Sequence, residues 1–251
     1  MQLLQQFQDY LTQQDRSPAT VRGYITDLNV FARWLERDLA TLGPVDVREY
    51  RALLLKNGAA AQTVNRKLAA IAAFGSWAVQ VGVLSANPAI HIRSVETVPL
   101  APKWLDKKQR SAFTLAMRDD LQKAKLRYPR LWLLRLRDAV VITLLLHTGL
   151  RVSEAANLRL ADLLLSERKA VLTVRAGKGG KQRQVPINSE ARRLLEEWLS
   201  VRPEVGSEML FIGQRGEPMQ VRSVQLGVAR VADLAGLQEV TPHTLRHTFA
   251  K

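Results

Sequence analysis

Apolar side chains in the first third of the chain recur every three or four positions, a spacing that is typical of amphipathic helices. The pattern predicts four helices, near residues 3–11, 18–35, 45–55 and 62–81. The second has Ser17 as its N-cap and Pro18 in its first turn, and a glycine follows each of the last two. The aromatic residues at helical spacing are predicted to be core residues: Tyr24, Phe31, Trp34, Phe74 and Trp77.

Beyond residue 103 the apolar pattern predicts helices interrupted by short strands. Long helices are expected at 106–125, 130–148, 189–200 and 221–235, a short one begins at Arg151, and Thr241-Pro242 opens the last. Residues 169–176 and 182–187 alternate like two strands, and 209–212 forms a short apolar run that predicts a third. The two alternating segments flank Gly177-Lys178-Gly179-Gly180-Lys181, which predicts a hairpin with a basic, glycine-rich tip.

Two prolines, Pro99 and Pro102, mark a break between these regions, because proline disfavours helix at its own and the preceding position. We therefore expect a helical domain at 1–92, a linker at 93–103 and a second domain at 104–251. The predicted fold class is mainly α with a small antiparallel β-hairpin or sheet (α+β).

Charge and composition narrow the function. The chain has 37 Lys and Arg against 23 Asp and Glu, a net charge of +14, and most of the excess lies beyond residue 95. A polyanion such as nucleic acid is the simplest partner for that excess, although a solvated basic surface is the alternative. The chain has no cysteine, which excludes disulfides, zinc fingers and thiol catalysis.

The histidines and the apolar segments argue against a metal-binding site and against a membrane-spanning segment. The histidines His243 and His247 could share a helix face, but the nearest preceding acid is Glu239, so no metal site is expected. The longest apolar run, 139–146, is far too short to span a membrane, and the N-terminus does not resemble a signal peptide. We expect a cytoplasmic protein.

Four residues could together hold a phosphodiester and manage its protons: Arg151, Lys178, His243 and Arg246. A guanidinium fork can bind two phosphate oxygens at once, and His243 and Arg246 lie three apart, on one turn of a helix. Singly, each arginine is more often a salt-bridged surface residue, and the lysine-bearing tip an exposed basic turn. The ordered set favours phosphate chemistry.

The motifs that carry this set resemble those of tyrosine recombinases of the phage-integrase family, chiefly its Xer-type and transposon-borne members. The matching segments are HTGLRVSE at 147–154, GKGGKQRQVP at 177–186 and HTLRHTFA at 243–250. The N-terminal region is also similar to the family's helical core-binding (SAM-like) domain, through SPATVRGYITDLNVF at 17–31, TVNRKLAAI at 63–71 and NPA at 87–89. The resemblance covers nearly the whole chain.

The resemblance implies site-specific cutting and rejoining of DNA through a 3′-phosphotyrosine intermediate, without metal or nucleotide cofactor. Arg151 and Arg246 would then clamp the scissile phosphate, and Lys178 would protonate the leaving 5′-hydroxyl. His243 would assist proton transfer at the nucleophile. Glu154 resembles the family's acidic residue near the first arginine and would position it, while His247 would have a supporting role within its helix.

The resemblance also implies partners: double-stranded DNA with inverted half-sites, closed within a clamp of the two domains, and a homo-oligomer that is tetrameric in the synapse. Candidate phosphate contacts are Arg66, Lys67, Lys181, Arg183 and Arg222, although each could be a solvated surface charge.

The family places a nucleophilic tyrosine after its second arginine, whereas the four tyrosines of this sequence all precede Arg151. The expectation is a chain that ends before its nucleophile and binds DNA without cleaving it. Tyr10 and Tyr24 are predicted to be core residues, while Tyr50 and Tyr128 could be exposed. Two alternatives remain open: a non-catalytic DNA-binding regulator derived from such a recombinase, and an enzyme resembling type IB topoisomerases.

Overall fold

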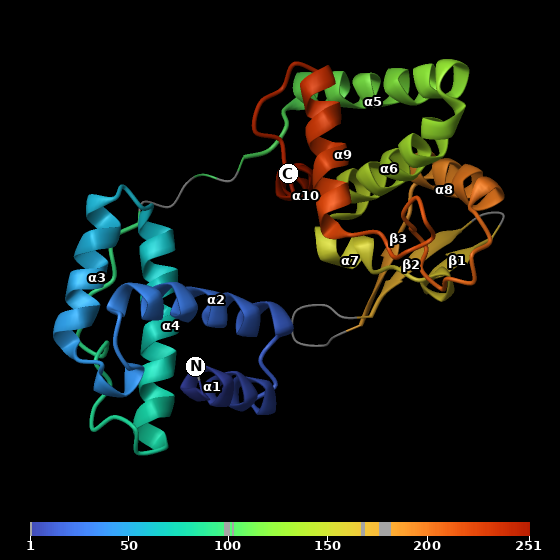
Figure 1. Ribbon diagram of the computed structural model, residues 1–251. Helices are drawn as coiled ribbons and strands as arrows, with labels where there is room; N and C mark the ends of the chain where they lie inside the picture. Colours follow the sequence, from blue (N-terminus) through green and yellow to red (C-terminus); the bar gives the residue numbers. More distant parts are fainter. Residues whose placement is uncertain (1, 98–100, 102, 167–168, 176–181) are drawn as a thin grey trace. The chain divides into compact units, whose positions relative to one another are not determined.

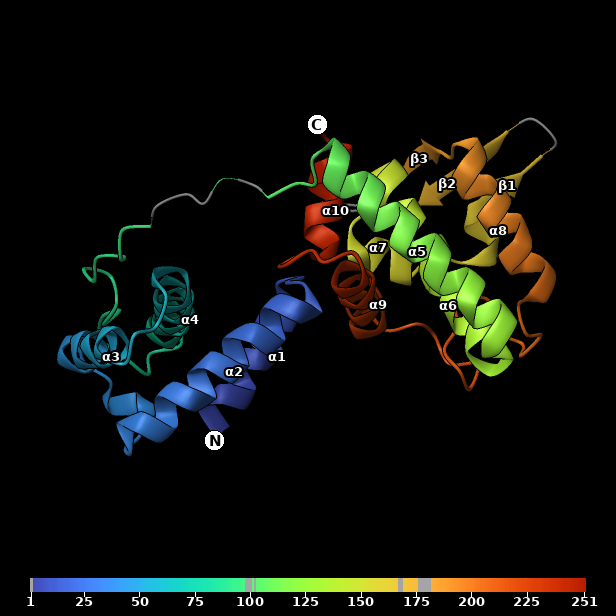
Figure 2. The ribbon, with the colours of Figure 1, turned by 90° about the horizontal axis from the view of Figure 1, so that it is seen from above.

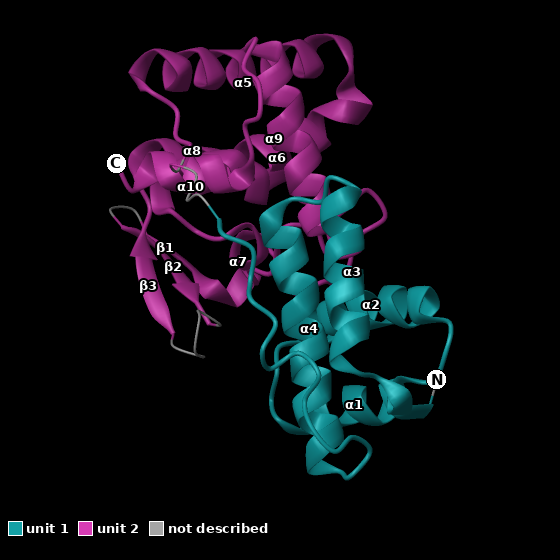
Figure 3. Cartoon of the chain, turned by 90° about the vertical axis from the view of Figure 1, so that its left-hand side faces the viewer, with its two compact units in different colours: residues 1–100 teal, residues 101–251 magenta. Residues whose placement is uncertain are grey.

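A computed structural model describes residues 2–97, 101, 103–166, 169–175 and 182–251 (Figure 1). The chain divides into two compact units, residues 1–100 and 101–251 (Figure 3). Each unit has a hydrophobic core of its own, and each is described separately below.

The described residues of the first unit, 2–97, form four α-helices and one short 3-10 helix. The α-helices are α1 (Gln2–Gln13), α2 (Pro18–Leu35), α3 (Pro44–Lys56) and α4 (Ala61–Gln80), and the 3-10 helix is Leu39–Thr41. All four predicted helices are thus confirmed. The predicted cap of α2 is also confirmed, because the Ser17 side chain accepts a hydrogen bond from the backbone N–H of Thr20.

Aromatic packing joins these helices. The ring of Phe7 on α1 lies 5.6 Å from that of Phe74 and 5.5 Å from that of Trp77, both on α4. The expectation that Tyr50 could be exposed is wrong. Its ring lies 4.8 Å from that of Phe31, and the residue is only 2% exposed, because α3 turns this position into the core.

The second unit is built around one central helix. Its α-helices are α5 (Lys107–Arg127), α6 (Pro129–Thr148), α7 (Val152–Ala156), α8 (Ser189–Val201), α9 (Val221–Leu234) and α10 (Pro242–Phe249), with a 3-10 helix at Leu160–Asp162. Helix α6 contacts all five of the others, and Figures 1 and 2 show it enclosed by them. Its sequence over 139–146 is apolar apart from Thr143, and every residue of this run is buried.

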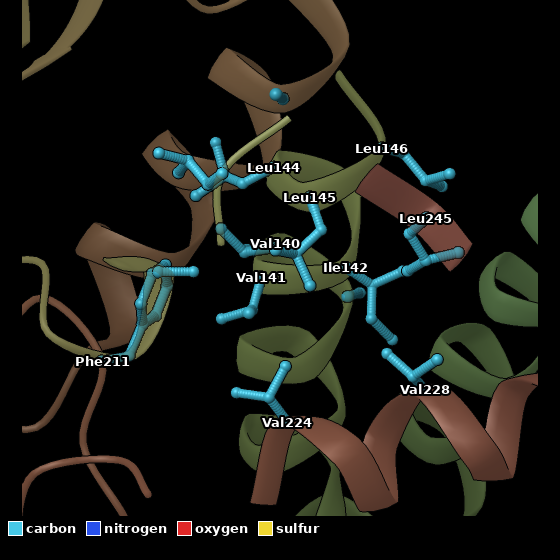
Figure 4. Close-up of a cluster of buried hydrophobic side chains, with 14 of the residues drawn as sticks. Val140, Val141, Ile142, Leu144, Leu145, Leu146, Phe211, Val224, Val228 and Leu245 are labelled. Carbon is cyan, nitrogen blue, oxygen red and sulfur yellow. The ribbon is translucent and has the colours of Figure 1, made fainter. Parts of the chain in front are cut away.

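Among the described residues, the central helix therefore supplies more of the buried core of this unit than any other single element. Figure 4 shows how the α6 side chains Val140, Ile142 and Leu145 lie among residues from other elements. Val224 and Val228 come from α9, and Leu245 comes from α10. A helix that is apolar on every side must be covered on every side, and this requirement fixes the arrangement of the neighbouring helices around it.

A three-stranded antiparallel sheet, in the order β1-β2-β3, completes the unit. The two predicted hairpin strands are confirmed as β2 (Ala170–Val174) and β3 (Arg183–Pro186), with Val174 opposite Arg183. Strand β1 (Leu163–Leu165) was not predicted, because three consecutive leucines show no alternation. The strand predicted at 209–212 is wrong: in the described part of the chain this segment forms isolated bridges, from Met209 to Arg159 and from Ile212 to Pro218.

The mainly α fold with a small antiparallel sheet confirms the predicted class. Among the described residues, no helix is long and apolar enough to cross a membrane.

Candidate active site

The turn between α6 and α7 places Arg151 at the surface of the second unit. Gly149 ends α6 in the left-handed conformation, with φ of 60°, and Leu150 is fully buried. A side chain at Gly149 would overlap the ring of Phe249, so both the backbone angle and the space require glycine here. Arg151 then becomes the N-cap of α7, with its side chain 43% exposed.

Glu154 holds Arg151 in this position. Its carboxylate accepts a hydrogen bond from the backbone N–H of Arg151 at 2.8 Å and another from Nη1 of the same residue at 2.9 Å. The backbone N–H and Nη1 of Arg151 are therefore both bonded to Glu154, while part of the guanidinium side chain stays exposed. This geometry agrees with the positioning role that the sequence suggested for Glu154.

A second arginine binds the same carboxylate from the sheet. Arg183 on β3 donates from Nη1 at 3.1 Å and from Nη2 at 2.7 Å to the two carboxylate oxygens of Glu154. Burial of Glu154 would raise its pKa, but the hydrogen bonds from Arg183 and Arg151 outweigh burial and lower this pKa to about 2. The carboxylate is therefore ionised at neutral pH, and the cluster of Arg151, Glu154 and Arg183 has a net charge of +1.

Helix α10 brings the second predicted arginine to the same turn. Thr241 caps the helix by accepting a hydrogen bond from the backbone N–H of Thr244 at 3.2 Å. Arg246 then donates from Nη1 to the carbonyl oxygen of Gly149, a residue that lies 97 positions earlier in the chain. The structure thus places Arg246 against the turn that carries Arg151.

The two histidines of α10 contact each other. Nε2 of His243 lies 2.8 Å from Nε2 of His247, and the two rings are 4.1 Å apart. Since only one of the two nitrogens can provide the proton, this contact couples their tautomers. His243 is exposed and His247 half-buried, which agrees with a supporting role for His247. No group of residues suited to a metal ion occurs in the described part of the chain.

The remaining predicted residues fall into two groups. Lys178 and Lys181 lie outside the described residues. Arg66 and Lys67 on α4 both pair with Asp27 of α2, whose side chain is 3% exposed. Arg66 remains 53% exposed, whereas Lys67 is only 13% exposed, so Arg66 is the better placed of the two for a phosphate. Arg222 is exposed in the first turn of α9.

Sequence reasoning placed Arg183 among the DNA contacts and missed its pairing with Glu154. A signal for its burial, but not for its partner, was present: in β3 the half-buried positions alternate with exposed ones, and Arg183 shares the inner face with Val185. It also missed His147, in the last turn of α6, whose Nδ1 lies 2.9 Å from Nδ2 of Asn188.

Similarity to known proteins identifies the family of this chain. Residues 105–251 match the model of the phage integrase family, and residues 4–82 match the model of the phage integrase N-terminal SAM-like domain. The chain belongs to the phage integrase family. The family predicted from the three motifs is thereby confirmed, and with it the assignment to the tyrosine site-specific recombinases.

Several curated members of the phage integrase family are similar over most of their length. The tyrosine recombinase XerC of Corynebacterium glutamicum is 33% identical over 237 residues, which are 94% of this chain and 72% of the relative. XerC of Alcanivorax borkumensis is 33% identical over 258 residues, covering 100% of this chain and 80% of the relative.

Solved structures of recombinases share the fold. The XerH site-specific recombinase bound to its palindromic difH substrate matches 92% of this chain and 67% of its own, with a TM-score of 0.72 and 23% identity. The lambda integrase tetramer bound to a Holliday junction matches 99% of this chain and 68% of its own, with a TM-score of 0.72 and 17% identity.

Proposed function

We propose that this protein binds duplex DNA and cuts and rejoins it at specific sites. In this reaction Arg151 and Arg246 would together clamp the scissile phosphate. The observation that supports the proposal is the hydrogen bond from Arg246 to Gly149, since it brings two arginines from distant motifs to one turn. Two guanidinium groups at one phosphate would stabilise the charge that develops on its oxygens in a pentavalent transition state.

The other roles follow the family motifs. Lys178 would donate the proton to the leaving 5′-hydroxyl, and His243 would assist proton transfer at the nucleophile. His243 suits this role because it is exposed beside Arg246 on α10 and because its partner His247 can fix its tautomer. A tyrosine nucleophile would take the phosphoryl group in a 3′-phosphotyrosine link, which conserves the bond energy without metal or nucleotide.

The partner we propose is a duplex with inverted half-sites, bound by a homo-oligomer that becomes tetrameric in the synapse. Arg66 and Arg222 are the exposed candidates for phosphate contacts, with Lys67 and Lys181 as further candidates. Because such contacts release counterions, the logarithm of the affinity should fall linearly with the logarithm of salt, with a slope of about −0.9 per phosphate.

The experiment begins with selection of the target from random duplexes. Covalent attachment to that target is then measured in a version of the protein that carries a tyrosine after Arg246. Arg151→Ala and Arg246→Ala should each abolish attachment while sparing most binding, whereas the control Arg159→Gln, which removes an arginine paired with the exposed Glu208, should leave both unchanged. Strong cleavage by either alanine variant would contradict the proposed clamp.

A separate assay tests the lysine. Lys178→Ala should slow cleavage of a normal target, because the 5′-hydroxyl leaves poorly without a proton. A target with a 5′-thiol leaving group needs no proton and should restore the rate. Failure of this rescue would remove Lys178 from the acid role.

A further inference from the structure

The carboxylate of Glu154 is fully used by two arginines. Oε1 accepts from Nη1 of Arg151 and Nη1 of Arg183, and Oε2 accepts from the backbone N–H of Arg151 and Nη2 of Arg183. The Glu154 side chain is only 4% exposed, so protein groups rather than water satisfy its carboxylate. Moving either arginine would therefore leave a buried charge with unmet hydrogen bonds.

Arg183 also changes the net charge around Arg151. Paired with Arg151 alone, the carboxylate would cancel the positive charge that an incoming phosphate needs. With Arg183 on the same carboxylate, the three residues keep a net charge of +1. Arg183 thus both fixes the orientation of the carboxylate and prevents it from neutralising Arg151.

The strand geometry shows that Arg183 reaches this position from the sheet. Arg183 pairs in register with Val174 of β2, and its side chain points to the inner face of β3 together with Val185. The ion pair with Glu154 therefore ties β3 to the first turn of α7. The guanidinium of Arg183 is committed to two parallel hydrogen bonds, the arrangement that gives an arginine–carboxylate pair its rigidity.

A second arginine of the sheet provides a natural comparison. Arg175, which follows β2, pairs with Asp162, whose side chain is also 4% exposed. Asp162 caps its own short helix by accepting from the backbone N–H of Arg159 at 2.9 Å. Both pairs join the sheet to a buried capping carboxylate, but among the described residues only the pair of Arg183 includes a carboxylate that also holds Arg151.

We propose that Arg183 is a positioning residue for the DNA reaction, which acts through Glu154 to orient and charge Arg151 at the scissile phosphate. This inference rests on the proposed function, since it takes Arg151 as a phosphate ligand. It replaces the simpler expectation that Arg183 itself contacts DNA. In this arrangement the guanidinium of Arg151 is preorganised before DNA arrives.

The test replaces the phosphates of the selected target, one at a time, with the neutral group methylphosphonate. The sensitivity at each position is the factor by which this replacement weakens binding. In the unmodified protein, neutralising the phosphate held by Arg151 should weaken binding by about tenfold or more, the size expected of a charged hydrogen bond. Arg151→Ala identifies that position, because it should remove the sensitivity there. Arg183→Met should reduce the sensitivity at the same phosphate to about threefold or less.

Two further variants separate charge from geometry and from stability. Arg183→Lys keeps the charge but loses the two parallel hydrogen bonds, so its sensitivity should lie between those of the unmodified protein and Arg183→Met. Arg175→Met removes the same charge and an equivalent ion pair, and it should retain the full tenfold sensitivity. Thermal unfolding of each variant checks that the bound protein is folded.

The outcomes are distinct. A tenfold sensitivity that persists in Arg183→Met would overturn the positioning role. A loss in Arg183→Met that falls at a different phosphate would overturn it too, because it would show direct contact of Arg183 with DNA. If no phosphate loses its sensitivity in Arg151→Ala, the proposed function fails together with this inference; if Arg151 defines such a phosphate and Arg183 does not affect it, only the inference fails.

Discussion

Arg246 donates a hydrogen bond to the carbonyl oxygen of Gly149, two residues before Arg151. The glycine thus has three tasks: it ends α6, it accepts the bond from Arg246, and it makes room for the ring of Phe249. The position of the second arginine relative to the first therefore depends on a residue with no side chain.

Gly149→Ala should destabilise the second unit by about 2 kcal/mol or more, because alanine is strained at positive φ and its Cβ would overlap Phe249. Urea unfolding measures the loss. Gly236→Ala is the matched control, since Gly236 has φ of 67° with open space around its Cβ, and it should cost about 1 kcal/mol. Equal losses in the two variants would show that Phe249 does not restrict the turn.

Glu154→Gln should lower the free energy of unfolding by about 1–3 kcal/mol at neutral pH, because the amide replaces charged hydrogen bonds and places a donor beside two arginines. The carboxylate has a pKa of about 2 in the folded protein against an ordinary 4.5, so its contribution is complete above about pH 4.5 and is lost as the pH falls toward 2. The difference between the two proteins, followed by denaturant unfolding, should therefore shrink over this range. A difference that stays constant down to pH 2 would contradict the ion-pair cluster.

His147→Gln should make the stability of the protein less sensitive to mild acid. Burial lowers the pKa of His147, against the opposing effect of Glu190, so the unfolded chain binds a proton at a higher pH than the folded one. The stabilising contribution is thus complete above about pH 6.5 and falls as the pH drops below that value. Unfolding curves between pH 7 and pH 5 should show a steeper loss for the unmodified protein, and parallel losses would refute the prediction.

Asp138→Ala should destabilise the second unit by about 3 kcal/mol, since Asp138 on α6 binds Arg137 at 2.8 Å and Arg230 of α9 at 3.3 Å. Arg137 is itself 8% exposed and would be left without its carboxylate. Glu208→Ala, which breaks an exposed pair with Arg159, should change stability by less than about 0.5 kcal/mol. Chemical denaturation of both variants tests the contrast, and a similar small loss in each would show that the buried pair is not required.

Local sequence patterns predicted most of the helices because each pattern is contained in the element that it predicts. The cap at Ser17 and the glycine after α6 are examples, since both act within one turn of the chain. The family motifs were also recognisable, because each retains its residues at a fixed local spacing. Strand β1 was missed because its three residues gain their structure only from pairing with β2.

Long-range pairings were beyond the sequence for the same reason. Nothing near Arg183 in the chain indicates that its partner is Glu154, 29 residues earlier, rather than a DNA phosphate. Tyr50 was likewise expected to reach the surface, and only the packing of α3 against Phe31 and Trp34 shows otherwise. Periodicity identifies the face of an element, whereas the partner of that face is set by the assembled fold.

The burial of α6 has a consequence for how this protein can change over evolution. The helix that ends at Gly149 is also the centre of the hydrophobic core, so a substitution that shifts it would move the arginine turn by the same displacement. Correct packing of the core is therefore required for the correct position of Arg151. Substitutions in this part of the core are therefore limited by the geometry of the arginine turn as well as by stability.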